Sequence, residues 1–243
     1  MKENILHNLE TIHARIQKSC EKSGRNPNEV KLLLATKTVS AEQIKTALEN
    51  GEFLIAENKV QELKEKYNDL TNTPHDNHFI GHLQTNKIKD ILKYDVVCVQ
   101  SLDRLDLAEK LHQRLLSVGK TMEVLIQVNT SGEESKFGVH PDEAVELTRK
   151  VSEFSTLKIK GLMTIGLFSA EIEKVRLCFK ILKNLQQELI RLDIPNVDMK
   201  ELSMGMSGDL ETAIEEGSTI VRVGTAVFGS RIYPDSFYWN EGV

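Results

Sequence analysis

The sequence predicts a single (β/α)8 TIM barrel, an α/β fold, with an additional N-terminal helix. The chain has 243 residues, a length typical of one such barrel. Eight short apolar runs alternate with amphipathic segments, which is the pattern of parallel strands joined by helices. No Pro/Gly/Ser-rich linker and no internal repeat interrupts this alternation. We therefore expect one domain over residues 1–243.

The first element is predicted to be a helix that ends near Gly24 and Pro27. Its apolar residues recur on one helical face: Ile5, Leu9, Ile12 and Ile16. Similar apolar stripes predict helices over 103–118 and 171–191. The apolar runs predict strands at 31–36, 52–57, 78–83, 96–101, 122–129, 157–165, 201–205 and 219–224.

An open, doubly wound sheet is the alternative arrangement of such elements. A dinucleotide-binding sheet should carry G-x-G-x-x-G after an early strand, and the sequence has none. Residues 119–121 resemble the end of a phosphate-binding P-loop. However, Arg114 stands where that loop requires a glycine, and a strand follows instead of a helix. The closed barrel is therefore favoured.

Composition and charge narrow the classes of function. The chain has 31 Lys and Arg against 36 Asp and Glu, a net charge of −5, which disfavours non-specific binding to nucleic acid or anionic membranes. The N-terminus has no apolar signal segment, and no apolar run approaches the ~18 residues of a membrane span. We expect a cytoplasmic protein whose cysteines, Cys20, Cys98 and Cys178, are reduced thiols.

Two charged residues interrupt or end apolar strands at what should be the functional, C-terminal face of the barrel. Lys37 shares the face of Leu33 and Ala35. Burial of its ammonium group lowers the pKa and makes the amine a better nucleophile towards a carbonyl; solvent exposure is the alternative. Arg222 lies within the last strand and needs a buried partner. That partner is either a ligand or a carboxylate such as Glu57 or Glu201.

Small residues follow the last two strands, where barrels often bind phosphate. Gly224 and Thr225 end strand eight, and the loop 203–209 leads into a helix expected to begin near Ser207. A helix N-terminus with a free hydroxyl binds anions, although Ser207 could simply cap the helix. A reactive lysine, a fixed arginine and a phosphate cradle suit a ligand with an aldehyde and a phosphate. Pyridoxal 5'-phosphate (PLP) has both.

Six segments in order along the chain carry a family resemblance. They are LLATKTVS (33–40), ENKVQE (57–62), HFIGHLQTNK (78–87), GLMTI (161–165), SMGMSGD (203–209) and VRVGTAVFG (221–229). With them the sequence resembles the PLP homeostasis family of the YggS/PROSC type. This resemblance implies the barrel of alanine racemase's N-terminal domain, PLP fold type III, without the C-terminal β domain.

The resemblance also implies roles for individual residues. Lys37 matches the lysine that forms the internal aldimine with PLP, and Arg222 matches the arginine facing the pyridine nitrogen. Other cofactor-binding positions are matched by Asn58, Met204, Ser207, Gly224 and Thr225. Lys59 stands where the family usually has tyrosine. No metal site is expected, because His78 and His82 lie four apart in a strand, a spacing that does not bring both to one ion.

An arginine beside the pyridine nitrogen disfavours protonation of the ring, so the ring is a weaker electron sink. Related racemases compensate with a tyrosine from the β domain of the partner subunit. This chain ends soon after its eighth strand, at Tyr233 to Trp239, so we expect one face of the cofactor to be open. The sequence therefore predicts a PLP carrier, without a catalytic residue beyond the Schiff-base Lys37, that passes PLP to apo-enzymes.

Three alternatives to the carrier stay open. They are a weak PLP-dependent amino-acid racemase, a Schiff-base aldolase acting on a phosphosugar, and an adaptor whose surface binds PLP enzymes. Because the usual racemase dimer contact is missing, we expect a monomer. Two side chains near the mouth have undecided roles: His82, expected to end the third strand, and Lys136, which could offer PLP a second amine or lie in solvent.

Overall fold

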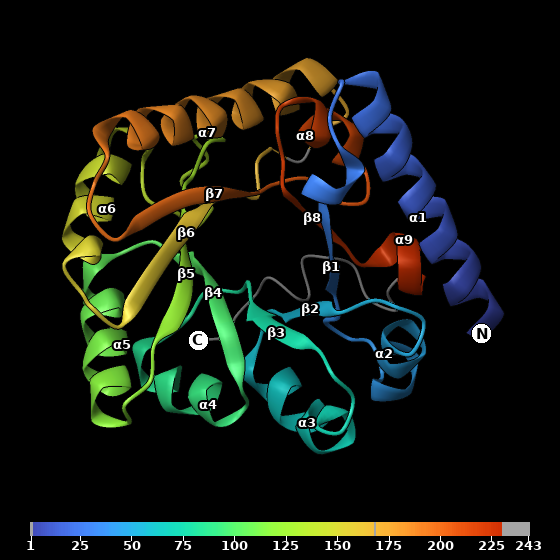
Figure 1. The fold of residues 1–243 in the computed structure, drawn as a ribbon, viewed down its shortest axis with the longest axis horizontal. Helices are drawn as coiled ribbons and strands as arrows, with labels where there is room; N and C mark the ends of the chain where they lie inside the picture. The colour runs from blue at the N-terminus through green and yellow to red at the C-terminus, as the bar shows by residue number, and fades with distance from the viewer. Residues whose placement is uncertain (1, 168, 230–243) are drawn as a thin grey trace.

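The computed structural model describes residues 2–167 and 169–229. Within these ranges, eight parallel strands form a closed barrel in chain order, in which β8 pairs with β1 (Figure 1). The strands are β1 (Lys31–Ala35), β2 (Leu54–Glu57), β3 (Asp76–Phe79), β4 (Val96–Leu102), β5 (Met122–Gln127), β6 (Leu157–Met163), β7 (Val197–Ser203) and β8 (Ile220–Val223). The predicted barrel is confirmed. The single domain over 1–243 stays a prediction, since residues 230–243 lie outside the described residues.

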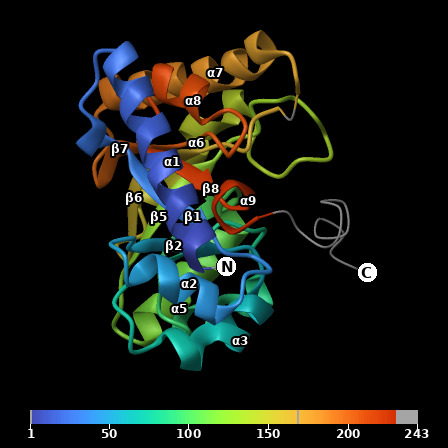
Figure 2. The ribbon, with the colours of Figure 1, turned by 90° about the vertical axis from the view of Figure 1, so that its right-hand side faces the viewer.

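Helices surround the barrel. They are α1 (Lys2–Lys22), α2 (Ala41–Leu48), α3 (Val60–Leu70), α4 (Ile88–Lys93), α5 (Leu105–Ser117), α6 (Ala144–Ser152), α7 (Ile172–Leu192), α8 (Leu210–Glu215) and α9 (Thr225–Phe228). The predicted helix α1 is confirmed, and its apolar stripe is buried. It packs on α2, α8 and α9 rather than connecting two strands (Figures 1 and 2). No described helix is both long and apolar enough to cross a membrane.

The core has two layers because successive strand residues face opposite sides of the barrel wall. Leu33, Ala56 and Ile220 form one cluster inside the barrel, and Cys98, Leu125 and Met163 form another. The larger clusters lie between the barrel wall and the helices. The three cysteines are buried, free thiols, as predicted.

Two boundaries near the barrel mouth differ from the prediction. β3 is Asp76–Phe79, so His82 lies in the loop after the strand rather than at its end. This loop turns at Gly81, where a Cβ atom would lie 1.9 Å from the Asn58 carbonyl oxygen. α8 begins at Leu210 rather than near Ser207, because Asp209 Oδ1 accepts from the Met206 N–H at 2.5 Å and closes a turn over 206–209.

Candidate functional site

Lys37 lies at the barrel mouth, in the turn that follows β1. Its predicted burial is confirmed, since it is only 9% exposed. The next residue, Thr38, has φ = 65°, an unfavourable conformation for a β-branched residue. The carboxylate of Glu62 accepts the N–H of Thr38 at 3.1 Å and that of Lys59 at 3.2 Å. Glu62 therefore fixes the turn that carries Lys37 to the start of α3.

A buried ion pair lies between the barrel wall and α3. Lys66 Nζ is 2.7 Å from Oε1 of Glu57, and the two residues are 8% and 2% exposed. The Thr36 hydroxyl donates to the same carboxylate oxygen at 2.7 Å, and Lys66 donates to the Thr36 carbonyl at 2.8 Å. Burial raises the pKa of Glu57, and the Lys66 charge opposes this rise. Together these contacts tie Thr36, the residue before Lys37, to α3.

Arg222 projects into the barrel from β8, on the same face as Ile220. It is 5% exposed, and it donates to Ser203 Oγ at 2.8 Å and to the Thr164 carbonyl at 2.7 Å. Burial lowers its pKa to about 10, while Asp209 acts in the opposite direction. Arg222 is therefore still a cation at neutral pH.

The alternative of an ion pair between Arg222 and Glu57 or Glu201 is wrong. Glu57 faces outward to Lys66, and Glu201 bonds Lys31 at 2.5 Å near the start of β1. Glu57 is paired with Lys66 and Glu201 with Lys31, so neither carboxylate is the partner of Arg222. The hydrogen-bond acceptors of Arg222 in the structure carry no charge.

The two small-residue loops meet, as predicted. The Thr225 hydroxyl donates to the Ser207 hydroxyl at 3.5 Å. A Cβ at Gly224 would lie 2.9 Å from the Ala35 carbonyl oxygen, so this close approach to β1 needs glycine. Arg15 of α1 donates to the Ser207 carbonyl at 3.0 Å and thus anchors the loop from outside.

Met204 lies in the same loop, but its side chain belongs to the core between the barrel and the helices. Its N–H donates to the Ile220 carbonyl at 3.1 Å. Met204 therefore packs in the core next to the loop of Ser207, and its contact with a cofactor stays a prediction.

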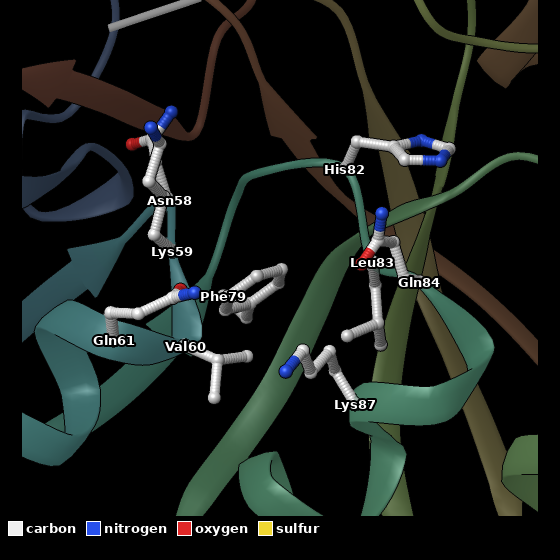
Figure 3. Close-up of a pocket in the computed structure, with 9 residues that line it drawn as sticks. All are labelled: Asn58, Lys59, Val60, Gln61, Phe79, His82, Leu83, Gln84 and Lys87. Carbon is white, nitrogen blue, oxygen red and sulfur yellow. The ribbon is translucent and has the colours of Figure 1, made fainter. Parts of the chain in front are cut away.

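Asn58 follows β2 and borders a cavity of about 210 Å³ at the rim of the mouth (Figure 3). Its Oδ1 atom is buried without a hydrogen-bond partner among the described residues. Figure 3 shows Phe79, Val60 and Leu83 in its lower part with the Lys87 ammonium beside them, and Asn58 and His82 in its upper part. The lining residues are Asn58, Lys59, Val60, Gln61, Phe79, His82, Leu83, Gln84 and Lys87.

Loops from separate strands are joined at the mouth. The His82 ring stacks on Phe137 with centroids 4.0 Å apart. Lys136 donates to the Gly166 carbonyl at 2.9 Å and pairs with Glu133. The structure thus shows Lys136 held between the loops after β5 and β6. Extension into solvent is wrong, and a second amine offered to PLP stays a prediction.

Sequence reasoning missed the polar residues below Arg222. Ser203 Oγ donates to Gln100 Oε1 at 2.6 Å, and Gln100 Nε2 lies 2.8 Å from His78 Nδ1. Burial and the nearby Lys31 lower the pKa of His78 to about 3. Strand alternation could have revealed these residues, because each is a polar residue at an inward position of its strand.

Comparisons with known proteins agree with this geometry. Residues 3–232 match the family described as "Alanine racemase, N-terminal domain". The pyridoxal phosphate homeostasis protein of Aquifex aeolicus is 45% identical over 95% of this chain and 100% of its own length. The protein of the same name from Escherichia coli K12 is 37% identical over 95% of this chain and 98% of its own.

Solved structures show the same barrel. PipY of Synechococcus elongatus with PLP bound is 29% identical with a TM-score of 0.78, covering 88% of this chain and 100% of that one. An alanine racemase of Clostridium difficile is 16% identical with a TM-score of 0.75, covering 96% of this chain but 58% of the racemase. The latter shows a shared fold only. The chain thus belongs to the alanine racemase N-terminal domain family and, within it, to the pyridoxal phosphate homeostasis proteins.

Proposed function

We propose that this chain binds PLP at the barrel mouth, holds it as a reversible Schiff base on Lys37 and passes it to apo-enzymes. The observation that carries the proposal is the convergence on one mouth of a buried lysine, a buried arginine and two hydroxyl-bearing loops. The PLP-bound structure of PipY supports the choice of ligand. PLP supplies an aldehyde that reacts reversibly with amines.

The residues present fit such a ligand. Gly224 allows the backbone close to β1, and Ser207 and Thr225 offer hydroxyls beside it, as suits a phosphate. Arg222 has five N–H donors, of which the structure engages two. The buried Oδ1 of Asn58, which has no hydrogen-bond partner among the residues that the structure describes, is a further polar contact that we propose for the ring.

The charge of Arg222 disfavours transaminase and decarboxylase activity. A buried cation facing the ring nitrogen disfavours its protonation, and an unprotonated ring is a poor electron sink for transamination or decarboxylation. The proposed roles of the site residues are therefore binding and orientation. We further propose that the protein acts as a monomer in the cytoplasm, which light scattering and cell fractionation test.

Borohydride reduction followed by peptide mass mapping tests the Schiff base. We expect a phosphopyridoxyl group on the Lys37 peptide after incubation with PLP and its loss in Lys37→Ala. Lys87→Ala removes another lysine near the mouth and should leave the labelling intact. An unmodified Lys37 at saturating PLP would refute the proposal.

Transfer is tested separately, by mixing the PLP-loaded protein with an apo-enzyme in the presence of a scavenger of free PLP. Activation faster than that given by equal free PLP supports a carrier. Exchange of the Cα proton of an amino acid above the rate with free PLP would instead support the racemase alternative.

A further inference from the structure

A line of hydrogen-bonded side chains crosses the barrel interior from Arg222 to His78. Arg222 Nη1 is 2.8 Å from Ser203 Oγ, Ser203 Oγ is 2.6 Å from Gln100 Oε1, and Gln100 Nε2 is 2.8 Å from His78 Nδ1. Ser203 and Gln100 are fully buried, and His78 is 8% exposed. The four residues come from β8, β7, β4 and β3, so only the closed barrel brings them together.

The atoms that face one another set the direction of every bond in this line. A guanidinium group can only donate, so the Ser203 oxygen accepts from Arg222. The single hydroxyl proton of Ser203 is then given to the Gln100 carbonyl oxygen. This orientation turns the Gln100 amino group toward His78, whose Nδ1 must accept. His78 is therefore neutral with its proton on Nε2, in agreement with its burial.

Arg222 also keeps its positive charge, because its hydrogen-bond partners are neutral. Its second acceptor, the Thr164 carbonyl, is fixed by the Thr164 N–H donating to the Ser203 carbonyl at 3.1 Å. Both acceptors of Arg222 are neutral, so neither cancels the positive charge. The guanidinium is held by β7 and by the residue that follows β6, and among the described residues its other N–H groups have no acceptor. We expect these groups to face the ligand.

We propose that Ser203, Gln100 and His78 are positioning residues that orient Arg222 through neutral hydrogen bonds rather than through a direct ion pair. Among the described contacts its acceptors are neutral, and Asp209 acts on it by charge alone. The site thereby selects a ring that places a neutral acceptor atom against Arg222. This inference rests on the proposed binding of PLP, whose unprotonated pyridine nitrogen is such an atom. It assigns selectivity to residues that need not touch the ligand.

The test compares PLP with 1-deaza-PLP, which has carbon in place of the ring nitrogen and keeps the aldehyde and the phosphate. A hydrogen bond from a charged donor predicts that the wild-type protein binds PLP about 10 to 100 times more tightly. We expect Gln100→Leu to reduce this preference at least about fivefold, because Ser203 then has no fixed acceptor for its proton. A variant that lost only contacts to the phosphate or the aldehyde would bind both ligands more weakly by the same factor. The ratio of the two affinities would then be unchanged.

A matched control is Gln186→Leu. Gln186 is also a buried glutamine, 4% exposed, but its amide bonds the Met199 carbonyl outside the barrel interior. It should lower stability without changing the ratio of the two affinities. An unchanged ratio in Gln100→Leu would overturn the inference, as would an equal change in Gln186→Leu.

A second measurement needs no ligand. Nitrogen-15 chemical shifts of the imidazole in the cofactor-free protein should show His78 neutral, with its proton on Nε2. Gln100→Glu should move a proton onto Nδ1 of His78, since a carboxylate facing that atom can only accept. A wild-type His78 protonated on Nδ1 would overturn the directions derived above. If PLP does not bind at all, the proposed function fails, whereas this ligand-free result still judges the line itself.

Discussion

Replacing Lys66 by methionine should leave a buried carboxylate without its cation. Lys66 Nζ makes two short contacts, 2.7 Å to Glu57 Oε1 and 2.8 Å to the Thr36 carbonyl. Methionine fills much of the same space but carries no charge. The remaining partner of Glu57 in the structure is then the Thr36 hydroxyl. The change therefore isolates the electrostatic loss from a packing loss.

The magnitude follows from the burial of the pair. Glu57 is 2% and Lys66 8% exposed, so solvent screens their interaction little. Removing one partner of a buried pair costs about 3–5 kcal/mol. For a chain of this size that corresponds to a fall in Tm of roughly 6–20 °C. Because the Thr36 carbonyl also loses its donor, we expect weaker PLP binding at the neighbouring Lys37.

The loss should depend on pH. Burial raises the folded-state pKa of Glu57 above 4.5, and removal of Lys66 raises it further. In that range the fold keeps a proton that the unfolded chain has released, so stability falls as the pH rises from 4.5 towards the folded-state pKa. The wild-type Glu57, with a folded-state pKa of about 8, ionises before that of the variant, so the deficit of Lys66→Met should be larger near pH 9 than near pH 6.

Urea unfolding of a double-mutant cycle measures these effects. Lys66→Met, Glu57→Gln and the double variant are compared at both pH values, with Lys64→Met as an exposed control on α3. The double variant should regain most of the loss, because a neutral glutamine needs no cation. A deficit that is the same at both pH values, or a double variant as unstable as Lys66→Met, would refute this reasoning.

Three further predictions concern Gly81 at the mouth, Arg15 behind the loop of Ser207, and His78 inside the barrel. Gly81→Ala would place a Cβ 1.9 Å from a backbone oxygen, whereas the Cβ of Gly208→Ala would meet nothing within 4 Å. Calorimetry should show a large loss of stability for Gly81→Ala and none for Gly208→Ala. Arg15→Ala should lower the affinity for PLP about two- to tenfold and the affinity for pyridoxal, which has no phosphate, less. Lys18→Ala should leave both affinities unchanged, and titration with each ligand measures them. The pKa of His78 is lowered from 6.5 to about 3, so neutral His78 contributes stability that is lost as the pH falls below 6.5, by about 2 kcal/mol at pH 5. In urea unfolding, the stability of His78→Gln should therefore fall less between pH 6.5 and pH 5 than that of the wild type. An equal fall in both proteins would contradict this prediction.

Features that depend on local periodicity could be read from the sequence. The alternation of apolar runs and amphipathic stripes identified the strands and the barrel, because strand and helix periods differ. Lys37 and Arg222 were recognisable because a charge at an inward position of an apolar strand needs a special environment. The loops with Ser207 and Gly224 were placed together because strands seven and eight are neighbours in such a barrel.

Contacts across the barrel could not be read in the same way. The neutral acceptors of Arg222 come from β7 and from Thr164, the residue after β6, and the line beyond Ser203 continues to β4 and β3. Which side chains meet there depends on the stagger of all strands around the closed barrel. The alternative of a carboxylate partner for Arg222 is wrong, since Glu57 lies one residue out of phase and faces α3, and Glu201 pairs with Lys31.

The sequence by itself determined the barrel, its order of strands, and the lysine, arginine and small-residue loops at one mouth, because these depend on periodicity and on the rule that strand ends meet at one face. Only the tertiary structure decided that Arg222 rests on neutral acceptors, that Glu57 and Lys66 brace the turn before Lys37, and that α1 anchors the loop of Ser207. The physical reason is that hydrogen bonds require atoms within about 3 Å in a suitable direction. Residues far apart in the chain reach that precision only when the barrel closes and its helices pack.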